Sequence, residues 1–128
     1  MTQYYKLPEK PTTNDLQNAL QFLANNMSKL ADQLSTYKTD VAYANAKYKR
    51  AYARALVKNQ NAKNATMVKA LAEIDELVEE TQDELNAKNA IYTIAEGEYE
   101  GMETQFVAIR KIVEIQKLEY KGEYGNGA

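Results

Sequence analysis

Apolar residues recur at alternating steps of three and four positions through most of this 128-residue chain. A 3.5-residue repeat sustained over about 40 residues is typical of long helices that pair along an apolar seam, as in coiled coils. The first series is Leu16, Leu20, Leu23, Met27, Leu30, Leu34, Tyr37, Val41, Ala44, Tyr48, Ala51 and Ala55. The second is Leu71, Ile74, Val78, Thr81, Leu85, Lys88, Tyr92, Ala95, Tyr99, Met102, Phe106, Ile109, Val113, Gln116 and Tyr120. Strands alternate with a period of two, so this spacing indicates helices.

The two series predict an all-α fold, an elongated antiparallel hairpin of two long coiled-coil-like helices. Thr12 or Thr13 is suited to cap the first helix, with Asp15 in its first turn, and Gly122 is a natural stop for the second. We expect an N-terminal tail at 1–11, helix one at about 13–57, a turn at about 58–65, helix two at about 66–121 and a C-terminal tail at 122–128. The hairpin as a whole is then 12–121. A continuous helix through the turn is the alternative, and its seams would be buried between subunits.

Charge is arranged in blocks, although the formal net charge is only −2. Residues 38–70 carry eight Lys or Arg against one Asp, and residues 71–104 carry eleven Asp or Glu against one Lys. Folding the chain about residue 62 brings the two blocks together, with Lys47 near Glu76 and Leu77. Complementary charges beside an apolar seam set the orientation and register of paired helices, so the blocks favour the antiparallel hairpin.

The chain contains neither His nor Cys, which removes the commonest catalytic base, thiol nucleophiles and the Glu-x-x-His ligands of di-iron bundles. Ser28 and Ser35 lie inside the first helical series, where no base is apparent. No glycine-rich phosphate loop occurs, and no apolar run approaches the length of a membrane span. We therefore expect a protein that is not an enzyme, holds no cofactor or metal, and does not associate with a membrane.

A second apolar series follows another side of helix two, roughly 110° from the main seam at about 100° per residue. A helix with two apolar faces needs two neighbours, which here means helix one and either a second copy, a different protein or a folded-back chain segment. We favour a dimer that forms a helical bundle. The series is Ile91, Ile94, Glu98, Gly101, Gln105, Ala108, Ile112 and Ile115. The candidate self-association or partner face comprises Ile91, Ile94, Gly97, Gly101, Ala108, Ile112 and Ile115.

Gly97 and Gly101 need an explanation, because each weakens a helix by about 1 kcal/mol relative to alanine. Gly101 lies at the centre of the second apolar series and Gly97 at its edge. They could let another backbone approach closely, or they could mark a kink.

The basic block interleaves aromatic and cationic residues, which is the composition of a surface for single-stranded nucleic acid. Cations would bind phosphates and tyrosines would stack on bases. The candidate residues are Tyr43, Lys47, Lys49, Arg50, Tyr52, Arg54 and Lys58. The alternative interpretation is structural, with the cations pairing with the acidic block.

The acidic block allows three interpretations. A rod of carboxylates could imitate a nucleic-acid backbone and occupy a nuclease or DNA-binding protein. The pairs Glu73/Glu76 and Glu80/Asp83 have a spacing that can hold Mg²⁺ in helical nucleotide pyrophosphatases, but both pairs lie on one helix. A solvated face is the third interpretation. The candidate mimic residues are Asp75, Glu76, Glu79, Glu80, Asp83 and Glu84.

Three segments carry a resemblance to a known group of proteins: "AKYKRAYARALVK", "ALAEIDELVEE" and "AIRKIVEIQKLEY". They are similar to small helical early-region proteins of bacteriophages and prophages of Gram-positive bacteria. The resemblance implies a location in the bacterial cytoplasm and a role in DNA metabolism or in blocking a host defence. It carries no catalytic motif.

Together these features predict a non-catalytic accessory factor that binds itself and a phage or host protein. The partner would process nucleic acid in recombination, replication or host defence. Two alternatives stay open: a structural or assembly protein such as a scaffold or chaperone, and direct binding of single-stranded nucleic acid through residues 43–58.

Overall fold

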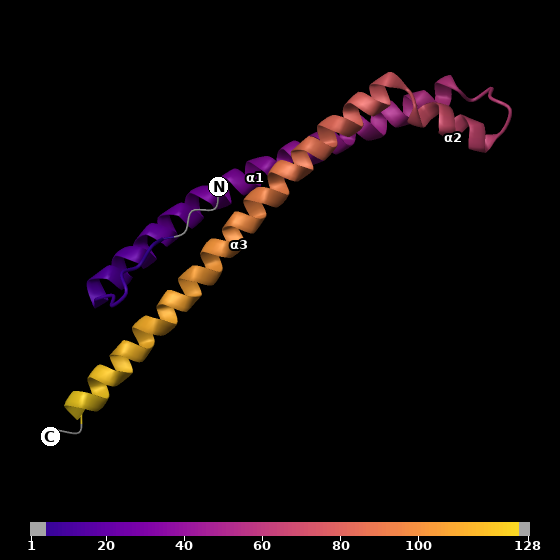
Figure 1. Cartoon of the computed structure of the whole chain (residues 1–128). Coiled ribbons are helices and arrows are strands. Elements are labelled where there is room, and N and C mark those ends of the chain that lie inside the picture. Colours follow the sequence, from indigo (N-terminus) through magenta and orange to yellow (C-terminus); the bar gives the residue numbers. More distant parts are fainter. Residues whose placement is uncertain (1–4, 126–128) are drawn as a thin grey trace. The chain divides into compact units, whose positions relative to one another are not determined.

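The computed structural model describes residues 5–125, and the side chains of residues 5–120. Three helices form this part of the chain: α1 (Thr13–Lys58), α2 (Ala65–Glu73) and α3 (Glu76–Gly125) (Figure 1). No strand occurs among the described residues, and α1 packs against α3, as the all-α prediction requires. The chain divides into two compact units.

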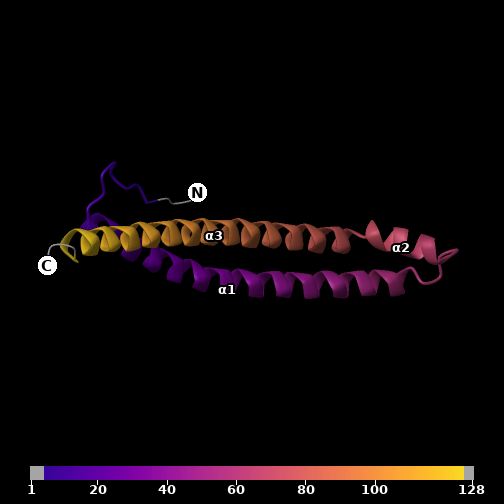
Figure 2. The same ribbon diagram turned by 90° about the horizontal axis from the view of Figure 1, so that it is seen from below.

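The first unit joins the part of α1 up to Gln33 to the part of α3 from Ala95 onward. The two segments run antiparallel, as Figure 2 shows. Their buried residues are mostly long apolar side chains: Leu16, Ala19, Leu23, Leu30, Ala95, Met102 and Ile109. This unit therefore has a hydrophobic core of large residues.

A reciprocal cap fixes the start of α1. The Asp15 backbone N–H donates to the Thr12 hydroxyl at 3.1 Å, and the Thr12 N–H donates to Asp15 Oδ2 at 2.9 Å. Each side chain satisfies a backbone donor that has no partner within the helix. The structure thus selects Thr12 from the two predicted caps.

The second unit comprises α1 from Leu34, the whole of α2, and α3 as far as Ile94. Its buried residues are mostly small: Ala44, Ala51, Ala55, Ala72, Val78 and Thr81. Three larger side chains, Tyr48, Tyr52 and Leu56, pack against this cluster while remaining partly exposed. Thr81 is a buried polar residue, and its hydroxyl donates to the carbonyls of Leu77 and Val78. Its hydrogen-bonding capacity is therefore satisfied within α3.

The predicted second helix is divided in two near its start. α2 ends at Glu73 and α3 begins at Glu76, where Asp75 Oδ1 accepts hydrogen bonds from Leu77 N (3.0 Å) and Val78 N (3.3 Å). An aspartate that captures these donors starts a new helix at this point. The break also leaves Ile74, a member of the predicted seam, 67% exposed.

The other boundaries lie close to the expectation except at the C-terminus. α1 ends one residue later than predicted, and Asn64 caps α2 by accepting from Met67 N at 2.8 Å. α3 continues through Gly122 to Gly125, so the predicted C-terminal tail is partly helical.

The predicted seams match the burial pattern. Every member of the first series is buried or half-buried, and in the second series the exceptions are Ile74 and Tyr120, which are exposed. The register differs from the prediction, however. Lys47 lies against Glu84, seven positions beyond Leu77. Successive heptads present the same apolar pattern, so a shift of one heptad preserves the burial of both seams.

Candidate interaction surfaces

Part of the basic block is paired with the acidic block in the second unit. Lys47 Nζ lies 3.4 Å from Glu84 Oε2, and Lys58 Nζ lies 3.6 Å from Asp75 Oδ2. Lys47 also lies over the ring of Tyr43, 5.2 Å from its centroid. Two of the candidate nucleic-acid cations are therefore held by carboxylates, as the structural interpretation expected.

Three other candidate cations, Lys49, Arg50 and Arg54, are exposed. Arg50 and Arg54 line a shallow groove of about 330 Å³ together with Glu80 and Glu84. A phosphate chain in that groove would meet carboxylates as well as guanidinium groups, which weakens its attraction for a polyanion.

The candidate tyrosines have different environments. Tyr52 stacks on Tyr48 with ring centroids 6.2 Å apart, and both are half-buried against the alanine cluster. Tyr43 is 60% exposed beneath Lys47. Of the two tyrosines predicted to meet nucleic acid, only Tyr43 therefore presents most of its ring to solvent.

The acidic block does not form a uniform rod of free carboxylates. Asp75 caps α3 and pairs with Lys58, and Glu84 pairs with Lys47. The remaining candidates, Glu76, Glu79, Glu80 and Asp83, are exposed. Among the described residues, no group of three acidic side chains is close enough together to hold a metal ion.

The second apolar face of α3 is mostly exposed. In the second unit, Ile91 and Ile94 are exposed. In the first unit, Ala108, Ile112 and Ile115 are also exposed, with Ile115 at 54%. Each of these side chains is therefore at least partly accessible to solvent.

The two glycines lie in an uninterrupted stretch of α3, and neither has a positive φ. A methyl group added to Gly97 would meet nothing within 4 Å, so this glycine is not required for packing inside the described chain. Gly101 differs because it is half-buried.

Two members of the exposed apolar surface, Val107 and Leu118, lie outside the predicted series. Val107 is exposed, and Leu118 is 69% exposed. Leu118 follows Ile115 by three positions, which places it on a neighbouring side of the helix. This spacing was visible in the sequence, but Leu118 falls outside the strict heptad that defined the series. We call Val107, Ala108, Ile112, Ile115 and Leu118 the α3 apolar surface.

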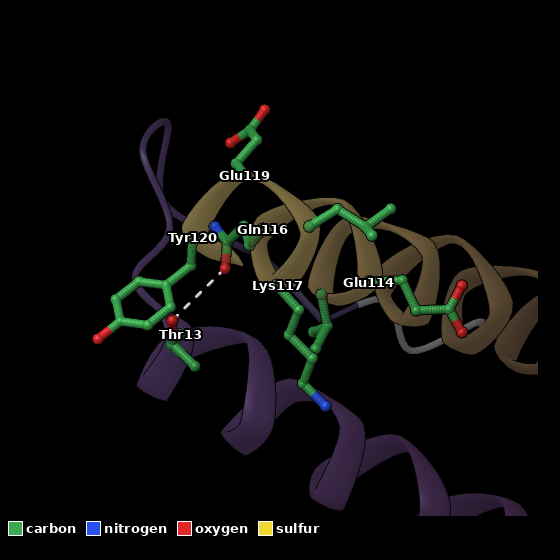
Figure 3. Close-up of a pocket in the computed structure, with 8 residues that line it drawn as sticks. Thr13, Glu114, Gln116, Lys117, Glu119 and Tyr120 are labelled. Carbon is green, nitrogen blue, oxygen red and sulfur yellow. Dashed lines mark hydrogen bonds between the residues drawn. The ribbon is translucent and has the colours of Figure 1, made fainter. Parts of the chain in front are cut away.

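A hollow of about 750 Å³ lies beside this surface, where the start of α1 meets the end of α3. The Thr13 hydroxyl donates to Gln116 Oε1 at 3.5 Å across it, whereas Glu119 points away (Figure 3). Val113 and Leu118 contribute apolar walls, and Lys117 and Tyr120 also line it. The hollow is wide open to solvent.

The N-terminal segment before α1 folds back onto the first unit. The Tyr5 backbone N–H donates to Gln105 Oε1 at 3.2 Å, and Gln105 Nε2 donates to the Tyr5 carbonyl at 2.8 Å. The Tyr5 ring lies 5.2 Å from that of Phe22, centroid to centroid. Tyr5, Leu7 and Pro11 are half-buried. The sequence predicts a tail here, although a folded-back chain segment is one of the neighbours it allows for the second apolar face, and these contacts fit that alternative.

Comparison of the chain with protein-family models, with curated proteins and with solved structures finds no match in any of the three. The helices of the described residues include none whose length and apolar character would allow it to cross a membrane.

Proposed function

We propose that this protein acts without catalysis, by binding another protein through the α3 apolar surface. The observation that carries the proposal is the group of exposed apolar side chains on this section of α3, above all Ile112, Ile115 and Leu118. Exposed apolar residues that are contiguous on one helix mark interaction sites more often than isolated ones do.

A second copy of the chain is the first partner, because closed symmetric pairs are the commonest assemblies of soluble proteins. Two antiparallel α3 segments would then cover each other and build the expected helical bundle. The second partner is a phage or host protein that processes nucleic acid in recombination, replication or defence. The three segments that resemble phage early-region proteins support this choice.

The double substitution Ile112→Ser with Ile115→Ser tests the proposal. Both side chains are exposed, so helical content measured by circular dichroism should be retained while the self-association constant falls tenfold or more. The matched control is Lys111→Ser with Glu114→Ser, which changes two exposed residues on the same turns without altering the net charge. Its association constant should stay within about twofold of the parent.

Sedimentation velocity at micromolar concentrations gives the mass of the assembly, and capture from infected host cells gives the second partner. A mass of 14.5 kDa at every concentration, with no protein captured specifically by the parent, would contradict the proposal. A captured nuclease or recombinase supports the accessory role, whereas a capsid or tail protein would favour the structural alternative.

Single-strand nucleic-acid binding is a second candidate because Lys49, Arg50 and Arg54 are exposed. It predicts a salt-dependent shift of labelled single-stranded DNA that is lost in the double variant Arg50→Glu with Arg54→Glu. The control Lys29→Glu with Lys111→Glu makes the same change of charge elsewhere on α1 and α3. No shift at low salt would remove this candidate.

A further inference from the structure

The N-terminal segment occupies the middle of the second apolar face of α3. Gln105 is a polar member of that otherwise largely apolar series, and its amide group makes both of its hydrogen bonds to the backbone of one residue, Tyr5. A glutamine amide that accepts an N–H and donates to the C=O of the same residue holds an extended chain in place. This pairing gives a physical reason for a polar residue at the centre of the face.

Burial differs along the face. Gly101 and Gln105 are half-buried, whereas Ala108, Ile112 and Ile115 are exposed. On the other side of the segment, the Tyr5 ring packs against Phe22 of α1. The segment is therefore bound to both helices of the first unit.

From these contacts we infer that residues 5–11 are a detachable cover, which must leave α3 before a second copy can pair along its second apolar face. The inference rests on the proposed self-association of α3. A partner helix that packs over Gln105 would need the space that the Tyr5 backbone occupies.

Competition of this kind lowers the apparent affinity of self-association by the fraction of molecules whose cover is open. Loss of the hydrogen bonds to Gln105 or of the ring contact with Phe22 should therefore raise that fraction. A partner that binds residues 5–11, or cleavage within them, would strengthen pairing of α3 without touching the paired surface.

Two variants of the full chain open the cover from opposite sides. Gln105→Ala removes both hydrogen bonds to Tyr5, which should raise the open fraction about tenfold. Tyr5→Ala removes the contact with Phe22 and leaves α3 unchanged, so any gain in association cannot come from a more apolar face. The matched controls are Gln82→Ala, an exposed glutamine of α3, and Glu9→Gln, an exposed residue of the cover.

Opening is measured as the rate of tryptic cleavage at the Lys6–Leu7 bond, since cleavage follows the open population when opening is fast. Association is measured by sedimentation of the uncleaved proteins. We expect cleavage to rise about tenfold in Gln105→Ala and severalfold in Tyr5→Ala, with the association constant rising in parallel and both controls unchanged.

Unchanged cleavage in Gln105→Ala would overturn the inference, because Gln105 would not hold the segment. Faster cleavage with an unchanged association constant would also overturn it, because the segment would open without competing. If the parent and all variants stay monomeric, the proposed self-association fails together with the cover. If the parent associates and the variants do so equally, the cover alone fails.

Discussion

The two units use different kinds of core. The first buries long side chains such as Leu16, Leu23 and Ile109, whereas the second buries mainly alanines together with Val78. Full burial of a leucine contributes about 1.5–3 kcal/mol, while an alanine contributes roughly 0.8 kcal/mol for its methyl carbon. The first unit therefore depends on apolar burial, and the second on close packing of small residues supported by polar contacts.

The surfaces of the two units also differ, with charged pairs on the second unit and exposed apolar side chains on the first. The second unit carries the Lys47–Glu84 and Lys58–Asp75 pairs and the Asp75 cap. The first unit exposes the α3 apolar surface and binds the N-terminal cover. Substitutions that remove apolar volume should therefore act most strongly in the first unit, and substitutions that add volume should act in the second.

The largest expected effect is that of Leu23→Ala in the first unit. Leu23 is completely buried, so its truncation leaves a cavity and should lower the free energy of unfolding by about 2–5 kcal/mol. Urea denaturation followed by circular dichroism measures the loss. The neighbouring exposed residue Gln21 provides the control Gln21→Ala, which should change stability by less than about 0.5 kcal/mol. Equal losses for the two variants would contradict the leucine core.

The next largest loss of stability is expected for Ala51→Leu in the second unit. Ala51 belongs to the cluster with Ala55, Ala72 and Val78, so a larger side chain must push the helices apart at a cost of about 1–3 kcal/mol. Ala53→Leu is the matched control, because Ala53 is exposed two positions along the same helix. Thermal unfolding compares them. A stabilised Ala51→Leu would mean that the alanine cluster leaves unfilled space, and the contrast between the units would be lost.

Asp75→Ala should have an intermediate effect, a loss of about 1–2 kcal/mol, because it removes the cap of α3 and the partner of Lys58. Asp83→Ala removes an exposed carboxylate from the same acidic block and is the control. Hydrogen exchange at the amides of Leu77 and Val78 should accelerate only in Asp75→Ala. Identical behaviour of the two variants would assign Asp75 to the solvated face instead of the cap.

The sequence predicted the helices and their buried sides because a 3.5-residue repeat depends only on local spacing. It did not predict the break at Asp75, since the apolar series runs across that position through Ile74 without a change of step. Aspartate before Glu76 and Glu79 is a helix-start signal that the analysis did not use. The break became visible only where Asp75 Oδ1 meets two backbone donors.

The surfaces were predictable to a smaller extent. Periodicity identified Ile112 and Ile115 as members of a second face, and both are exposed because, in the described chain, only α1 packs as a helix against this part of α3. Periodicity could not show that Tyr5 reaches Gln105, because that contact joins residues 100 positions apart and one of them lies outside any helix. The charge blocks likewise predicted which helices pair, but they did not predict the register, that is, which heptads of the two helices lie side by side.

The smallest expected effect is the coupling free energy between Lys47 and Glu84, which tests the register of the two helices. A double-mutant cycle of Lys47→Ala and Glu84→Ala should give about 0.2–1 kcal/mol, the range for an exposed ion pair, and the coupling should fall as salt is added. The control is a cycle of Lys47→Ala and Glu76→Ala, because Glu76 is the residue near Lys47 in the register predicted from sequence. It should show no coupling, because Glu76 lies eight positions from Glu84 along the chain. If Glu76 couples and Glu84 does not, the seams mesh one heptad away from the arrangement described, and the alanine cluster must face different residues of α3.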